Sequence, residues 1–253
     1  MIELRPRDDT EQVLWEATLD LAVLLEGLPW TLVGAQMVIL HAFEAGEVTG
    51  RTTGDLDFLF DVRAHVGATE DAAARLLAAG FTETEPSPDG VAHRFTRGVV
   101  VVDVLAPDGL GGRTSRATIG KGRTVQVPGG SQALSRSEVV DVSLGDRLGQ
   151  LRRPSLLGAI LLKARAVGAA PEEAAKHRGD LAFLCGLVRD PRTLASELRQ
   201  TERGWLRARG ELHDRAHLAW RMSRHPDDAF LTFRILLGDG REVDIEQLGA
   251  PTP

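Results

Sequence analysis

Three aspartates are the residues of this chain whose type and spacing best suit them to chemistry. Asp55 and Asp57 lie in the segment 55–60, where polar and apolar residues alternate as in a strand, so their side chains are expected on one face, about 7 Å apart. Asp103 interrupts the apolar run 99–105, where a charge is costly unless it is paired or metal-bound. If the two strands are neighbours, three carboxylates converge. Their mutual repulsion calls for a divalent cation, and oxygen ligands favour Mg²⁺ or Mn²⁺.

Each part of this pattern also has a purely structural interpretation. Asp55 and Asp57 alone fit a solvated strand end, and Asp103 alone fits a charge on an edge strand. The combination is the more specific signal.

Gly34 and Ala35 lie between an expected strand and an expected helix. A helix that begins there directs backbone N–H groups and the positive end of its dipole at a phosphate, although such turns are common in α/β proteins. Arg51 is close enough in sequence to the carboxylates to help hold phosphate oxygens, or else is a solvated loop arginine.

Two residues of the second half also stand out. Lys163 lies in a helix that is apolar on nearly all sides, so it either extends to water or meets an anion such as a triphosphate; the anion is the favoured interpretation. Asp180 follows Lys176 by four residues, and an i,i+4 ion pair is its simple structural explanation.

The elements that position these residues form a mixed α/β half followed by a helical half. The pattern changes near Pro154, which predicts a first domain over 1–150 and a helical domain over 151–253. The segment 227–237 is open between helix and strand, with helix favoured. Helices are predicted over 11–27, 36–46, 69–79, 155–167, 172–188, 192–208 and 211–224, and strands over 30–33, 56–60, 92–96, 99–105 and 123–127.

Composition narrows the possible partners. The net charge of −6 argues against a uniformly basic protein that wraps nucleic acid, although residues 189–225 hold nine Lys or Arg against five Asp or Glu. A solvated helical face is the favoured explanation of that basic stretch. The single cysteine, Cys185, excludes an internal disulfide and is expected in the core. The charged start of the chain and the lack of long apolar stretches predict a cytoplasmic protein without a membrane partner.

Together these features resemble the nucleotidyltransferase fold and, more narrowly, the AbiEii/MenT-type nucleotidyltransferase toxins. The resemblance spans about residues 30–188. It rests on Gly34-Ala35, Arg51-x-Thr53-x-Asp55-x-Asp57, Asp103, Lys163 and Lys176-x-x-x-Asp180. One departure is Ala35, since the turn in the family is usually Gly-Ser or Gly-Gly.

The resemblance implies an α+β fold, with a nucleotidyltransferase-like mixed sheet, flanking helices and a helical C-terminal domain. It implies that Asp55, Asp57 and Asp103 bind metal and that Asp103 is the general base. Asp180 matches a later acidic position of the family and joins the catalytic set. Nucleotide contacts are assigned to Gly34, Ala35, Arg51, Thr53 and Lys163.

The implied reaction transfers NMP from an NTP, with Mg²⁺ or Mn²⁺ as cofactor, to a hydroxyl acceptor. By the resemblance, the acceptor is the 3′ end of tRNA and an antitoxin protein is the partner. The alternatives are a small hydroxylated acceptor of the aminoglycoside type and a non-catalytic nucleotide-binding protein of the same fold.

Overall fold

The computed structural model describes residues 1–85, 91–111, 114–118, 122–169 and 171–238. Its larger sheet is mixed: β3 and β6 run parallel at the centre, whereas β2 and β5 are antiparallel to their neighbours. The strand order is β2 (Trp30–Leu32), β3 (Asp55–Phe60), β6 (Val100–Pro107), β5 (Arg94–Arg97) and β4 (Thr82–Glu83), and β7 (Gln126–Val127) pairs with the end of β6.

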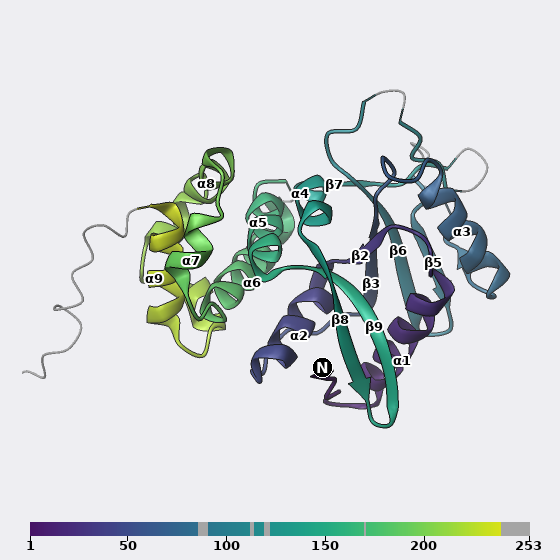
Figure 1. Ribbon diagram of the computed structural model, residues 1–253, viewed down its shortest axis with the longest axis horizontal. Coiled ribbons are helices and arrows are strands. Elements are labelled where there is room, and N and C mark those ends of the chain that lie inside the picture. The colour runs from purple at the N-terminus through teal and green to yellow at the C-terminus, as the bar shows by residue number, and fades with distance from the viewer. Residues whose placement is uncertain (86–90, 112–113, 119–121, 170, 239–253) are drawn as a thin grey trace, which may run out of the picture.

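Helices cover both faces of this sheet (Figure 1). The helices α1 (Asp9–Leu24) and α3 (Ala68–Ala78) share one hydrophobic core with Phe58, Val102 and Val104 of the central strands. Leu59 and Leu105 point to the other face and share a second core with α2 (Gly34–Ala45) and the helices that follow the sheet. Because side chains alternate along a strand, the odd-numbered aspartates of β3 and β6 lie on this second face.

A separate three-stranded sheet is formed by the first strand of the chain and by a hairpin that precedes the C-terminal helices. Its order is β1 (Ile2–Glu3), β8 (Ser137–Leu144) and β9 (Arg147–Pro154), with β8 and β9 forming an antiparallel hairpin and β1 parallel to β8. The short helix α4 (Gly130–Ser135) leads into it.

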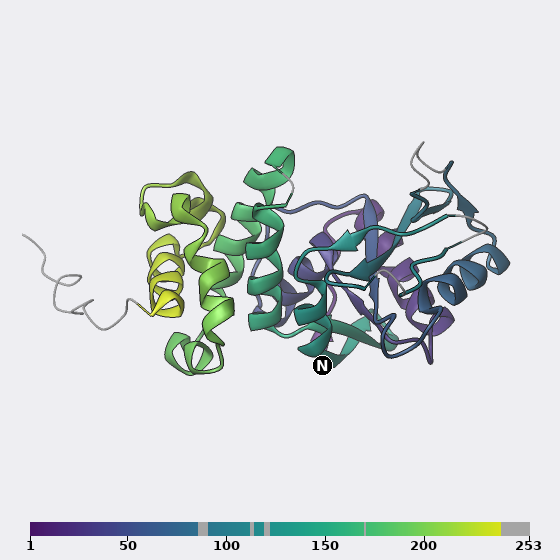
Figure 2. The same ribbon diagram turned by 90° about the horizontal axis from the view of Figure 1, so that it is seen from above.

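The remaining elements are helical and gather at one end of the molecule (Figure 2). The helices α5 (Leu156–Val167) and α6 (Ala174–Gly186) lie nearest the sheet, and α9 (Pro226–Leu237) lies further out (Figure 1). Trp220 packs against Phe233 of α9. The elements are α5 (Leu156–Val167), the 3₁₀ helix η1 (Pro171–Glu173), α6 (Ala174–Gly186), α7 (Pro191–Ser196), α8 (Gln200–Arg207), the 3₁₀ helices η2 (Gly210–His213) and η3 (Leu218–Met222), and α9 (Pro226–Leu237). The predicted α+β class with a helical C-terminal region is therefore confirmed.

Three sequence predictions differ from the structure. The single helix expected over 192–208 is two helices, because Asp190 caps α7 and the Glu202 side chain accepts from the Arg199 N–H at the start of α8. The helix expected over 211–224 is two 3₁₀ helices. The hairpin over 137–154 was not predicted. Its strand β9 spans residue 150, where the first predicted domain ends, and the division into two domains stays a prediction.

Two predictions from composition can also be compared with the structure. Cys185 is fully buried, as expected, and burial raises the pKa of its thiol. In the described part of the chain, no helix is long and apolar enough to cross a membrane.

Candidate active site

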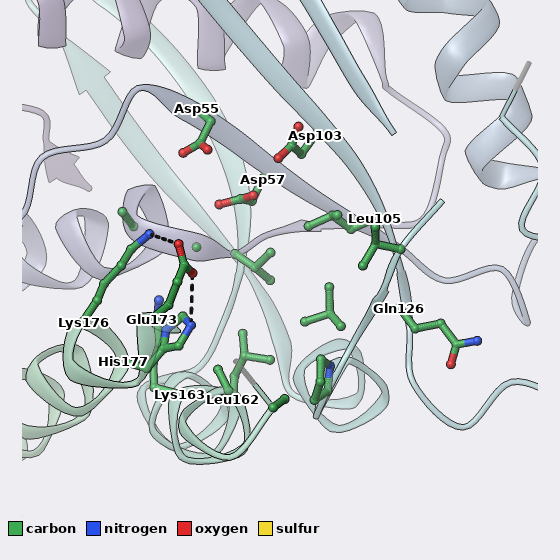
Figure 3. A pocket seen from close by; sticks show the side chains of 18 of the residues that line it. Asp55, Asp57, Asp103, Leu105, Gln126, Leu162, Lys163, Glu173, Lys176 and His177 are labelled. Carbon is green, nitrogen blue, oxygen red and sulfur yellow. Dashed lines mark hydrogen bonds and ion pairs between the residues drawn. The ribbon is translucent and has the colours of Figure 1, made fainter. Parts of the chain in front are cut away.

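A cavity of about 440 Å³ lies between the larger sheet and the helices α5 and α6. Figure 3 shows the three carboxylates on the sheet side and Lys163, Lys176 and His177 on the helical side. Gly34 and Ala35, at the start of α2, also line it. The cavity therefore brings together most of the residues that the sequence singled out.

Strand register explains why the carboxylates meet. Asp57 and Asp103 are directly opposite on the parallel neighbours β3 and β6, so their side chains leave the sheet side by side on one face. Asp55 lies two residues earlier on that face. Asp103 is buried, whereas Asp55 and Asp57 are partly exposed to the cavity.

The turn before α2 is closely fitted to this cluster. Gly34 has a φ of +66°, and a Cβ at this position would lie only 1.7 Å from Asp57 Oδ2. Only glycine allows both the left-handed backbone and the close approach. The start of α2 has no side-chain cap, so its first N–H groups are left next to the carboxylates.

Crowding changes the acidity of the central carboxyl. Burial, followed by the charges of Asp55 and Asp103, raises the pKa of Asp57 to about 7, although Lys163 and Lys176 oppose the shift. No ion pair or hydrogen bond to the Asp57 side chain occurs among the described residues. The Asp57 carboxylate is therefore repelled by Asp55 and Asp103, and a nearby cation would stabilise its charged form.

Arg94 is the site residue that the sequence analysis missed. It lies opposite Asp103 in the β5–β6 hairpin. Its guanidinium donates two hydrogen bonds to that carboxylate, from Nε to Oδ1 at 2.8 Å and from Nη2 to Oδ2 at 2.7 Å. The same Nη2 is 3.3 Å from Asp55 Oδ2. These carboxylates raise the pKa of Arg94 further above its usual range.

The hairpin predicted from the strands 92–96 and 99–105 could have revealed Arg94, because the position of its turn determines which residue faces Asp103. The turn was predicted at Arg97-Gly98, but Arg97 ends β5 and pairs with Val100. A two-residue loop at Gly98 and Val99 sets the register in which Arg94 faces Asp103.

Lys163, Arg51 and Asp180 form a buried ion-pair cluster beside the cavity. Lys163 Nζ lies 2.8 Å from Asp180 Oδ2, and Arg51 Nε lies 2.9 Å from Asp180 Oδ1. Asp180 therefore does not pair with Lys176 as its structural explanation supposed, and the anion that meets Lys163 is a side chain of the protein. The Asp180 side chain is fully buried and does not line the cavity, whereas Lys163 and Arg51 do.

Two further assigned residues have defined surroundings. The Thr53 hydroxyl donates to the backbone oxygen of Asp55 at 2.8 Å and lies 3.0 Å from its Oδ1, so it orients that carboxylate. Lys176 Nζ and His177 Nε2 each lie 3.5 Å from the Glu173 carboxylate on the helical wall (Figure 3).

The donor set suits a divalent cation in part. Asp55 and Asp57 supply the carboxylate oxygens that Mg²⁺ and Mn²⁺ prefer, and burial, followed by the negative charges of Asp55 and Asp103, raises the pKa of Asp57. Asp103, however, is already held by Arg94. Within the described residues, no group of three or more His, Cys, Asp or Glu side chains is arranged to hold a metal ion.

Three of the nine arginines in the basic stretch bind groups within the helical region itself. Arg203 donates to the carbonyl of Leu236 at 2.6 Å, and Arg207 donates to that of Leu237 at 2.8 Å. Both therefore satisfy carbonyls at the end of α9. Arg215 pairs with Asp227 at 2.8 Å.

Comparisons with known proteins give one structural similarity. No protein-family model matches the chain, and no curated protein matches it. A crystal structure of ANT(2″)-Ia in complex with adenylyl-2″-tobramycin is similar, with a TM-score of 0.45 and 16% sequence identity; the match covers 79% of this chain and 99% of that one.

Proposed function

We propose that this protein is a metal-dependent nucleotidyltransferase, which transfers NMP from an NTP to a hydroxyl acceptor and releases pyrophosphate. The observation that carries the proposal is the cavity, in which three carboxylates on adjacent strands lie opposite Lys163 and Lys176 (Figure 3). The start of α2 also lines this cavity. Carboxylates suit a metal-bound triphosphate, and the lysines suit its phosphate oxygens.

Each group has a defined task in this reaction. The acceptor oxygen forms a bond to the α-phosphorus while the bond to pyrophosphate breaks, and Asp103 accepts the hydroxyl proton. Asp55 and Asp57, with Asp103 as third candidate, would hold Mg²⁺ or Mn²⁺, which supplies charge neutralisation and orientation of the phosphates. The N–H groups at Gly34 and Ala35 suit a phosphate oxygen even without a hydroxyl at the second position.

Four residues next to the carboxylates support this arrangement. Thr53 orients Asp55, whereas Arg51 and Lys163 present positive charge to the cavity. Asp180 holds Arg51 and Lys163 in place, so we assign it a positioning role.

The test is label transfer from each α-³²P-labelled NTP with Mg²⁺. Asp57→Asn should lose about 100-fold or more, because several kcal/mol of charge stabilisation would be removed. Asp141→Asn is the matched control, since Asp141 is an exposed strand aspartate of β8 whose side chain accepts a hydrogen bond from Gln150 and does not line the cavity. Equal labelling by the wild type and Asp57→Asn would refute this site.

For the acceptor, the 3′ end of tRNA follows from the sequence resemblance alone, as do the toxin role and the antitoxin partner. One observation favours a small hydroxylated acceptor of the aminoglycoside type instead: Arg203, Arg207 and Arg215 are engaged within the helical region. Incubation with total RNA and with aminoglycosides, each with labelled NTP, separates the two. Binding of Mg²⁺-NTP by calorimetry without pyrophosphate release would favour a non-catalytic nucleotide-binding protein.

A further inference from the structure

Arg94 occupies the position where a cation is expected. Its guanidinium binds both oxygens of Asp103 and reaches Asp55 Oδ2, so one side chain bridges two of the three carboxylates. A planar guanidinium matched to a carboxylate by two parallel hydrogen bonds is a strong pairing. In the described structure, Arg94 therefore neutralises the same charges that a divalent cation would neutralise.

While Arg94 is bound to Asp103 and Asp55, it competes with a metal ion for these carboxylates. A divalent cation on Asp103 would lie beside a fixed positive charge, which repels it. The competition is direct, because the two oxygens of Asp103 are the atoms that Arg94 binds.

The guanidinium is also free to leave. The Arg94 side chain is 43% exposed, whereas that of Asp103 is 7% exposed, and both line the same cavity. Among the described residues, the side-chain hydrogen bonds of Arg94 all go to Asp55 and Asp103, and its charge also acts on Asp57 and His93. A long, half-exposed side chain can turn into the cavity without unpacking the core.

From this geometry we propose that Arg94 is an exchangeable counter-cation of the active site, which occupies Asp103 and Asp55 until a divalent cation displaces it. The exchange keeps the carboxylates together in the metal-free protein and makes completion of the three-carboxylate site depend on the cation. This inference deepens the proposed function, on which the identity of the cation rests.

The experiment measures Mn²⁺ affinity, by the loss of the free Mn²⁺ signal in electron paramagnetic resonance, without any nucleotide. Arg94→Gln should bind Mn²⁺ about tenfold more tightly than the wild type, because the competing charge is gone. Arg147→Gln is the matched control and should bind as the wild type does. Arg147 is a similarly exposed arginine that pairs with Asp20 at 2.7 Å and does not line the cavity.

Arg94→Lys keeps the experiment decisive if Arg94→Gln does not fold. It retains the positive charge but not the two parallel hydrogen bonds to Asp103, so its Mn²⁺ affinity should lie between those of the wild type and Arg94→Gln. Unchanged or weaker Mn²⁺ binding by the folded variants would overturn the proposal, because Arg94 would then support the metal site rather than compete for it.

The outcome is separable from that of the proposed function. Tighter Mn²⁺ binding by Arg94→Gln in a protein that transfers no nucleotide would support the exchange and refute only the proposed reaction. Nucleotide transfer with unchanged Mn²⁺ binding would refute only the exchange.

Discussion

Gly34 shows how tightly individual residues are fitted at this site. Gly34→Ala places a methyl group against Asp57 Oδ2 and strains a backbone with φ of +66°. We expect a loss of stability of about 1–3 kcal/mol and a fall in nucleotidyl transfer of at least tenfold, because Asp57 must move.

Gly46→Ala provides a control for the backbone strain alone. Gly46 ends the same helix with a φ of +71°, but a Cβ there meets nothing within 4 Å. Its stability should fall by about 1 kcal/mol with activity retained. Equal activity losses in the two variants, measured by label transfer, would contradict the steric role of Gly34.

The acidity of Asp57 predicts a pH-dependent stability. Its folded pKa, about 7, lies above its ordinary value of 3.8, so between these values the native state binds more protons than the unfolded state. The contribution of Asp57 to stability is therefore retained at low pH and is lost as pH rises towards 7.

Urea denaturation of the wild type and Asp57→Asn isolates this contribution from that of the other carboxylates. Near pH 4 the two should be similarly stable, whereas at pH 8 the variant should be more stable by at least about 1 kcal/mol. A constant difference across this range would show that Asp57 titrates normally.

At the scale of elements, strand pairing determines which side chains meet. The alternation in 55–60 and the apolar run around Asp103 were enough to predict β3, β6 and a shared face for Asp55 and Asp57. Sequence alone could not give the register that sets Asp57 opposite Asp103, because it depends on tertiary packing.

The hairpin β8–β9 shows a different limit of the sequence. Its strands combine charged residues with scattered apolar ones, since only part of each strand is buried. Without regular alternation, the two-residue period that identifies a half-buried strand is weak. The partners of Asp180 were missed for another reason. Spacing suggests its helical neighbour Lys176, but tertiary packing brings Lys163 and Arg51 to it.

The Asp180 cluster joins α5, α6 and the segment before β3, so we predict that it acts on stability first. Asp180→Asn should cost about 3 kcal/mol in urea denaturation, because Lys163 would remain charged and buried without its partner. The triple variant Arg51→Met, Lys163→Met and Asp180→Leu, which replaces all three charges, should recover more than half of that loss. Wild-type stability combined with lost activity in Asp180→Asn would instead support the direct catalytic role that the sequence suggested.

On the scale of the whole molecule, charge bears on the acceptor. The protein carries a net charge of −6, and its most basic stretch contains two groups of arginines. Arg203 is half-buried and Arg207 is exposed, and both donate to carbonyls at the end of α9, whereas Arg199 and Arg221 are exposed. Only exposed arginines can release counterions from RNA on binding.

The two groups give opposite predictions when each pair is replaced by alanine. Arg203→Ala with Arg207→Ala should lower the free energy of unfolding by about 1–3 kcal/mol, since two helix-end carbonyls lose their donors, and should change the salt dependence of RNA binding less than the second pair does. Arg199→Ala with Arg221→Ala should leave stability unchanged and, if tRNA is the acceptor, should reduce the slope of log affinity against log salt by up to about two. Filter binding of tRNA across a salt series, with parallel urea denaturation, measures both quantities. An unchanged slope in the exposed pair would exclude this surface as the RNA contact and would leave the small hydroxylated acceptor as the better-supported substrate.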